Sequence, residues 1–168
     1  MFKNLNYLFV TFFGLGSVRY IPGTVSSLVT TILLFSIFHI LNISNNIFLI
    51  FFSIIFLYSF FSVSKYIEER ENKDPKEIVI DEVIGQTIPI FLYEVSHGGE
   101  KSLQDILVIY TIIFLLFRLF DIFKPFPANL LDRKFKNSFG VIMDDVVAGF
   151  YVVLTLIVFM VLKSKYFI

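Results

Sequence analysis

The 168-residue chain contains no cysteine. This absence excludes disulfide frameworks, thiolate zinc sites and enzymes that use a cysteine nucleophile. The chain also has no excess of charge, because fourteen Lys and Arg residues balance fourteen Asp and Glu residues. The balance therefore indicates neither a nucleic-acid partner nor an acidic disordered tail. No small-x-small cleavage pattern follows the first apolar run, so we expect no cleaved signal peptide.

Apolar residues, by contrast, are abundant. They make up 57% of the chain, which includes 23 Phe, and the mean hydropathy is +0.81. A soluble domain of this length needs far less apolar surface. Four runs approach the length of a membrane span: Val25–Leu41, Ile47–Val63, Ile106–Phe123 and Val146–Leu162. Each has about 17 residues and would cover ~26 Å as a helix. We predict an all-α, polytopic membrane helical bundle with four to five membrane segments, in which residues 1–168 form a single domain.

The fifth segment is Ile78–Tyr93, which is apolar but carries acids and Pro89. Two loops are rich in basic residues: the first holds Lys65, Arg70, Lys73 and Lys76, and the second holds Lys124, Arg133, Lys134 and Lys136. Such loops are typically cytoplasmic. Both can share that side only if Ile78–Tyr93 crosses the membrane, and a re-entrant segment is the alternative. We also expect Ser64–Glu77 to extend the preceding helix to near Pro75.

Ionisable and polar residues at the ends of apolar segments indicate a site, and the alternatives are a structural salt bridge or a helix cap. The first cluster is the glycine-rich turn Gly14–Ser17 with Pro22, Gly23 and Thr24, just before the first span. Backbone N–H groups at such a helix start suit a phosphate. A plain N-cap at Thr24 is the alternative.

Three further clusters contain acids: Asp81 with Glu82, then Asp121 with Arg118 and Lys124, then Asp144 with Asp145. A helix start that favours acids explains the first pair as well as a site does. Arg118 and Asp121 are three residues apart, so a structural ion pair is possible there. Converging carboxylates at one membrane face would nevertheless repel one another unless they held a hard cation, most naturally Mg²⁺.

Several known catalytic motifs are absent from the sequence, which narrows the possible reaction types. His39 and His97 lie away from these clusters, so packing and solvent roles are favoured for both. No Asp-Gly dipeptide and no aspartyl-phosphate signature occurs. Phosphoryl chemistry with a cation, a basic pair and a glycine-rich turn is consistent with all four clusters. A metal-activated water and an unconventional carboxylate nucleophile both stay open.

In their order along the chain, the motifs resemble those of the phosphatidylglycerophosphatase A family: Gly14–Ser17 with Pro22–Thr24, Asp81–Gln86, Phe117–Pro127 and Met143–Gly149. The chain departs from the usual family pattern at Ser26 and Ile80. The resemblance implies an all-helical, Mg²⁺-dependent phosphatase of the bacterial inner membrane. Such an enzyme converts phosphatidylglycerophosphate to phosphatidylglycerol and inorganic phosphate.

From the residues and the resemblance together, we assign each expected site residue a role. The expected catalytic and Mg²⁺-binding residues are Asp81, Glu82, Asp121, Asp144 and Asp145, with one carboxylate as general base. The expected phosphate-binding residues are Gly23, Thr24, Arg118 and Lys124. The site should face the cytoplasm and take a phospholipid from the bilayer. A phosphatase for another lipid phosphate and a non-enzymatic small membrane transport protein are the alternatives.

Overall fold

The computed structural model describes residues 2–68, 70–97 and 102–166, and these residues form helices and connecting turns without a strand. In chain order the elements are α1 (Phe2–Val10), η1 (Leu15–Ser17), α2 (Pro22–Phe35), η2 (Ser36–Ile40), α3 (Asn45–Ile67), α4 (Ile80–Ser96), α5 (Leu103–Phe123), α6 (Ala128–Lys134) and α7 (Ser138–Tyr166). The segment η2 is a π-helical turn that continues α2. The predicted all-helical fold is confirmed.

Among the described residues, four helices are long and apolar enough to cross a membrane: Pro22–Ile40, Asn45–Ile67, Leu103–Phe123 and Ser138–Lys165. The four predicted spans are therefore confirmed, but at 19, 23, 21 and 28 residues they are longer than expected. Local side-chain bonds explain two early starts. Ser102 Oγ accepts a hydrogen bond from the Asp105 N–H before α5, and Asn137 Oδ1 accepts one from the Gly140 N–H at the start of α7.

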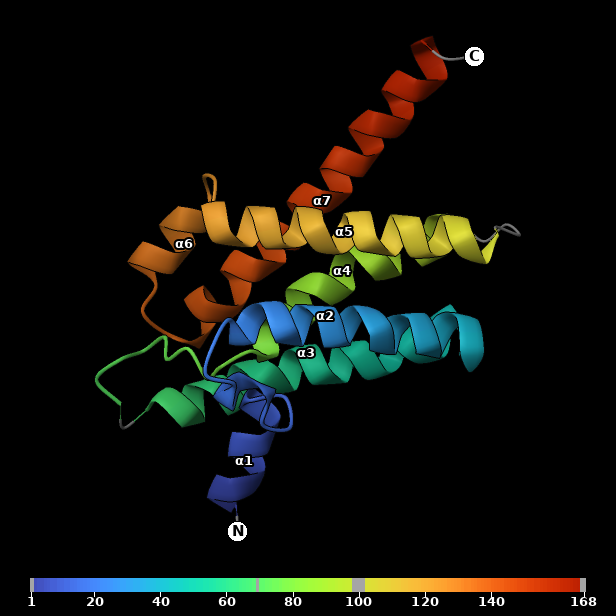
Figure 1. The fold of residues 1–168 in the computed structure, drawn as a ribbon. Helices are drawn as coiled ribbons and strands as arrows, with labels where there is room; N and C mark the ends of the chain where they lie inside the picture. Colours follow the sequence, from blue (N-terminus) through green and yellow to red (C-terminus); the bar gives the residue numbers. More distant parts are fainter. Residues whose placement is uncertain (1, 69, 98–101, 167–168) are drawn as a thin grey trace.

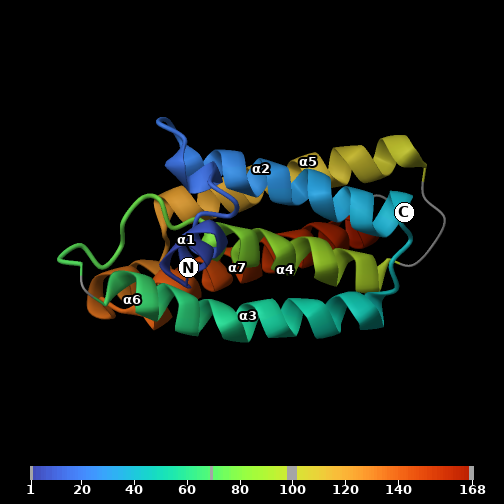
Figure 2. The same cartoon turned by 90° about the horizontal axis from the view of Figure 1, so that it is seen from below.

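The ambiguous fifth segment forms α4, a 17-residue helix at the centre of the bundle. It packs most extensively against α7 and α2. Helices α2, α4 and α7 begin at the end of the bundle where α3 and α5 finish (Figures 1 and 2). The two basic loops therefore lie at the same end, as the crossing model requires and the re-entrant alternative does not. Helix α4 starts at this end, directly after the first basic loop, and extends to the opposite end of the bundle, where α5 begins.

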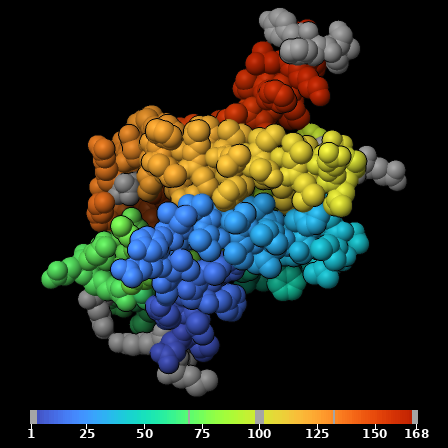
Figure 3. All heavy atoms as spheres, in the orientation of Figure 1, coloured from blue at the N-terminus to red at the C-terminus, as the bar shows by residue number. Residues whose placement is uncertain are grey.

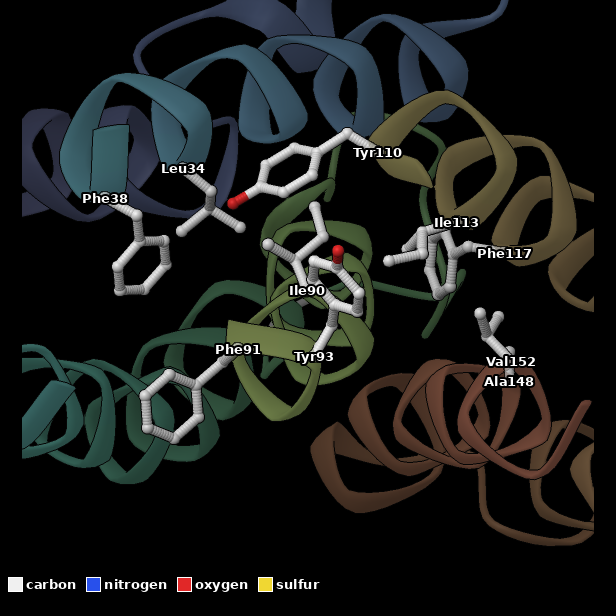
Figure 4. Packing of buried hydrophobic residues seen from close by; sticks show 10 residues of the cluster. All are labelled: Leu34, Phe38, Ile90, Phe91, Tyr93, Tyr110, Ile113, Phe117, Ala148 and Val152. Atoms are coloured by element: carbon white, nitrogen blue, oxygen red, sulfur yellow. The ribbon is translucent and has the colours of Figure 1, made fainter. Parts of the chain in front are cut away.

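Close packing around α4 produces the main hydrophobic core. Ile90, Phe91 and Tyr93 of α4 meet side chains from α2, α5 and α7 (Figure 4). The other buried members of this cluster are Leu34, Phe38, Tyr110, Ile113, Phe117, Ala148 and Val152. Figure 3 shows α2 and α5 side by side on one face, with the C-terminal part of α7 projecting beyond them. Much of the outer surface stays apolar, as expected for helices that face lipid.

The expected helical extension over Ser64–Glu77 is wrong beyond Ile67, where α3 ends. Lys73 Nζ donates to the carbonyl oxygens of Ile67 and Glu68 at 2.9 and 3.2 Å and so caps the helix. The loop that follows is held by Glu77, which accepts hydrogen bonds from Tyr66 Oη at 3.0 Å and Arg70 Nη1 at 2.7 Å. Burial acts to raise the pKa of Glu77, but these two donors outweigh it and lower that pKa below its ordinary value.

Candidate active site

A cleft of about 350 Å³ opens at the end of the bundle where α2, α4 and α7 begin and α5 ends. Every site residue predicted from the sequence lines this cleft: Gly23, Thr24, Asp81, Glu82, Arg118, Asp121, Lys124, Asp144 and Asp145. These residues come from four separate helices and the turn after α5. The fold therefore gathers side chains that are more than 120 residues apart in the sequence.

Three carboxylates form the centre of the cleft. Asp81, Glu82 and Asp145 each offer an oxygen, and the three oxygens lie within 4.8 Å of one another. Only 8% of the Asp81 surface and 3% of the Asp145 surface are exposed. Asp81 Oδ1, Glu82 Oε2 and Asp145 Oδ2 have no hydrogen-bond partner within the described part of the chain. Because orphaned buried carboxylates are costly, and because oxygen donors at this spacing suit a hard cation, the cluster fits a divalent metal ion.

The other two predicted ligands are occupied by cations of the protein itself. Arg118 Nη1 lies 2.7 Å from Asp121 Oδ2, so the structural ion pair considered from the sequence is present. Lys124 Nζ donates to Asp144 Oδ2 from the left-handed turn that ends α5. The five acids thus divide into three with open oxygens and two that orient a basic side chain beside them. Two cations within reach of a carboxylate cluster are suited to a phosphate ester.

Close helix approaches position the carboxylates. A Cβ at Gly149 of α7 would lie 2.5 Å from the backbone oxygen of Gly85, and one at Gly85 would lie 2.6 Å from the backbone oxygen of Asp145. Helices α4 and α7 therefore touch through two glycines, next to the acids they carry. At Gly23, an added Cβ would lie 2.1 Å from Glu82 Oε1, so a side chain at this position would displace that carboxylate.

Helix capping does not account for these residues. Asp144 and Asp145 lie about two turns inside α7, which begins at Ser138 rather than near Val146 as predicted. They are therefore too far from the helix start for its dipole to explain both acids. Thr24 is not an N-cap either, since α2 is preceded by Ile21 with Pro22 at its first position. Asp81 and Glu82 do occupy the first turn of α4, where a helix start favours acids, but both are also part of the cluster.

Comparison with known proteins assigns the chain to a family. A family model described as phosphatidylglycerophosphatase A matches residues 8–160. The chain belongs to this family. No solved structure matches the chain.

Three relatives show how far the similarity extends. The phosphatidylglycerophosphatase A of Haemophilus influenzae is 36% identical over 148 residues, which cover 88% of this chain and 84% of that protein. A Bacteroides thetaiotaomicron protein that is provisionally named a phosphatidylinositol-3-phosphatase is 30% identical, with 88% of each chain covered. The phosphatidylglycerophosphatase A of Escherichia coli is 30% identical over 45% of this chain and 39% of its own length.

Three polar residues of this family member were not predicted as part of the site. Ser27 Oγ accepts a hydrogen bond from Arg118 Nη1 at 3.3 Å and donates to the Gly23 carbonyl at 2.8 Å. Asp74 and Lys76 line the cleft from the loop before α4. The basic loop and its Pro75 were visible in the sequence, but only the folded loop brings these side chains to the acids. Ser27 gave no signal, because its partner lies 91 residues away.

The two histidines lie outside the cleft, in line with the packing and solvent roles favoured for them. His39 Nε2 lies 3.2 Å from Glu94 Oε1, which also accepts a hydrogen bond from Tyr110 Oη at 3.1 Å. His97 stacks on Tyr93 with ring centroids 4.7 Å apart. These groups lie at the end of α4 remote from the carboxylates. The contact between His39 and Glu94 was not predicted from the sequence, because 55 residues separate the two side chains.

Proposed function

We propose that this chain is a phosphatidylglycerophosphatase, which hydrolyses phosphatidylglycerophosphate to phosphatidylglycerol and inorganic phosphate in phospholipid biosynthesis. The observation that carries the proposal is the cluster of Asp81, Glu82 and Asp145, with oxygens within 4.8 Å of one another, in the same cleft as Arg118 and Lys124. The name of the Haemophilus influenzae relative supports the same substrate. The whole chain would act as one membrane-embedded domain.

The basic residues would hold the phosphomonoester. Arg118 presents its guanidinium between Asp121 and Ser27, and its Nε has no partner within the described residues. Lys124 lies at the exposed side of the same cleft, beside Asp144. Gly23 and Thr24 line the cleft at the start of α2, and the first N–H groups of a helix have no partner within it, so they could bind phosphate oxygens. These groups would neutralise the charge that grows on the phosphoryl oxygens during the reaction.

The carboxylates would bind Mg²⁺ and accept a proton. Asp81, Glu82 and Asp145 are the expected direct ligands, since the oxygens of Asp121 and Asp144 already face Arg118 and Lys124. When bound, a divalent cation polarises a phosphate oxygen and acidifies a water molecule. A carboxylate of the cluster would take a proton from the attacking water. The water oxygen would then bond to phosphorus while the bond from phosphorus to the glycerol oxygen breaks. That glycerol oxygen then takes up a proton and leaves as the hydroxyl of phosphatidylglycerol.

The position of the cleft fits a lipid substrate. It lies at the ends of membrane-length helices, beside both basic loops, which are typical of the cytoplasmic side. We therefore place the site at the cytoplasmic face of a bacterial inner membrane. A lipid could keep its acyl chains in the bilayer while its terminal phosphate enters the cleft.

Phosphate release from phosphatidylglycerophosphate by the purified protein tests this proposal. We expect turnover with Mg²⁺, none with EDTA, and a loss of at least about 100-fold after Asp121→Asn, which releases Arg118. Asp105→Asn is the matched control, because Asp105 lies on the same helix but is exposed and outside the cleft. Turnover that resists EDTA, or equal rates for Asp121→Asn and the control, would refute these roles.

A second lipid phosphate is the competing substrate. The name of the Bacteroides thetaiotaomicron relative favours a phosphorylated inositol lipid. A panel of phosphatidylglycerophosphate, phosphatidic acid and phosphatidylinositol 3-phosphate separates these possibilities. We expect the highest kcat/KM for phosphatidylglycerophosphate, and a higher value for another member would reassign the substrate.

A further inference from the structure

A second polar hollow, distinct from the catalytic cleft, lies where the end of α3 meets the connection between α6 and α7. It has a volume of about 430 Å³. Its lining residues are Phe61, Ser64, Lys65, Ile67, Glu68, Lys73, Lys136 and Asn137, and none of them lines the catalytic cleft. Three lysines against one glutamate give the hollow a net positive charge.

The lysines differ in how much of their charge is compensated. Lys136 forms no ion pair with any residue that the structure describes, and it is exposed. Lys65 Nζ lies 3.8 Å from Glu68, but both side chains are about two-thirds exposed, so the pair is weak. Lys73 is held in place because it caps α3 through two carbonyl oxygens. The hollow can therefore accept an anion without first breaking a buried interaction.

The surface that leads into the hollow is apolar. On α3, Ile50, Ile54, Leu57 and Phe61 are 61%, 59%, 69% and 64% exposed. Their spacing of three and four residues places them on one helix face, and Lys65 continues that face one turn after Phe61. This face belongs to a helix of membrane-spanning length. An apolar stripe that ends in a basic hollow is complementary to an anionic phospholipid. The stripe can contact the acyl chains, and the hollow can contact the headgroup.

We propose that this hollow binds the headgroup of an anionic phospholipid from the surrounding leaflet, with its acyl chains along the exposed face of α3. Lys65, Lys73 and Lys136 contact the phosphate and any further acidic group, and Ser64 and Asn137 donate hydrogen bonds. Basic pockets at the cytoplasmic ends of membrane helices favour such headgroups. Lipid would bind here whether or not the catalytic cleft acts on phosphatidylglycerophosphate.

The absence of tryptophan from the chain allows a direct test. Phe61→Trp introduces a single tryptophan at an exposed position of the hollow. The protein is reconstituted into vesicles in which either phosphatidylserine or phosphatidylcholine carries brominated acyl chains, at equal mole fractions. Phosphatidylserine is anionic but is not a product of the proposed reaction. We expect the brominated phosphatidylserine to quench this tryptophan several-fold more effectively.

Two controls decide the origin of that preference. Lys65→Gln with Lys136→Gln, in the Phe61→Trp background, should remove most of this several-fold preference and bring the quenching by the two lipids close to equal, because each lysine contributes to headgroup attraction. Lys163→Gln with Lys165→Gln removes the same charge near the far end of α7 and should leave it unchanged. Ile50→Trp, on the same face of α3 but remote from the lysines, should show no preference.

Three results would overturn the proposal. One is equal quenching by the two lipids at position 61. Another is an equal loss of preference in both double-lysine variants, which would indicate a general charge effect. The third is displacement of the lipid by millimolar inorganic phosphate alone, which would make the hollow a site for a soluble anion. Quenching measured with both lipids brominated should stay constant among the variants that carry Phe61→Trp, which verifies that each one is folded and inserted.

Discussion

The three clustered carboxylates should destabilise the protein in the absence of metal, and Asp145→Asn tests this directly. Asp145 lies within 4.8 Å of both other ligands, and Asn keeps its shape without its charge. Two ionised carboxylates at 4.8 Å repel by about 3.5 kcal/mol at an effective dielectric constant of about 20. Removing one charge relieves two such pairs. A buried carboxyl can relieve part of this repulsion by taking up a proton, so we expect Asp145→Asn to stabilise the metal-free protein by about 2 kcal/mol, which is less than the sum of the two pairs.

Thermal unfolding in detergent, with EDTA and then with Mg²⁺, measures the effect. For a chain of this size, 2 kcal/mol raises Tm by about 4–8 °C. If Mg²⁺ binds the folded cluster as proposed, it should raise the Tm of the wild type, and it should raise that of Asp145→Asn much less. In EDTA the Tm of Asp145→Asn should therefore exceed that of the wild type, and Mg²⁺ should close or reverse this difference in Tm. Asp105→Asn should change both values much less, since Asp105 is exposed and its carboxylate accepts a hydrogen bond only from Ser102 among the interactions described.

Either of two outcomes would refute this reasoning. A Tm for Asp145→Asn below that of the wild type in EDTA would show that the carboxylate is needed structurally without metal. An equal Mg²⁺-induced shift in both proteins would show that Asp145 does not ligate the ion. The Tm shifts test metal binding alone, because they need no lipid. Phosphate release measured on the same samples tests the substrate separately.

Three further predictions concern packing, the phosphate turn and pH. Gly149→Ala places a methyl group against the α4 backbone and should cost about 1–3 kcal/mol in thermal unfolding, whereas Leu154→Ala, at an exposed position of α7, should cost far less. Gly23→Ala pushes on the Glu82 carboxylate, a flexible group, so kcat/KM should fall at least about tenfold while Tm changes little; unchanged turnover would contradict the placement of this turn. The lowered pKa of Glu77 adds stability above its unfolded value of 4.5, and this stability is lost as the pH falls through the folded pKa. Glu77→Gln should therefore lower the free energy of unfolding at about pH 7 by no more than about 1 kcal/mol, seen as a lower Tm, and the gap should close by about pH 3.

Much of the site could be predicted from the sequence because acidic residues are rare within and beside membrane-spanning segments. Asp81, Asp121 and Asp145 stand beside long apolar runs, where an ionisable residue is rare without a purpose. The short-range pair of Arg118 and Asp121 also followed from helical spacing, and it is present at 2.7 Å.

Long-range pairings could not be predicted in the same way. Lys124 donates to Asp144 across 20 residues, and Arg118 donates to Ser27 across 91, so each bond depends on how whole helices pack. Helix ends were also misjudged. The predicted span from Val146 counted only apolar residues, whereas α7 begins at Ser138 because the amide of Asn137 binds the backbone of its first turn. Hydropathy reports the membrane core, but hydrogen bonding decides where a helix starts.

The close packing of α4 on α7 explains how the fold tolerates its own carboxylates. Each of the two helices contributes acids to the cluster, so mutual repulsion acts to separate them. The glycine contact between Gly85 and Gly149 lies within a turn or so of those acids and resists that separation through close backbone packing. A non-enzymatic transporter would need ionisable groups near the middle of the membrane, whereas here the repulsion is confined to the helix ends. A cation bound among these carboxylates would recover the stability lost at that end, which would link folding directly to the proposed chemistry.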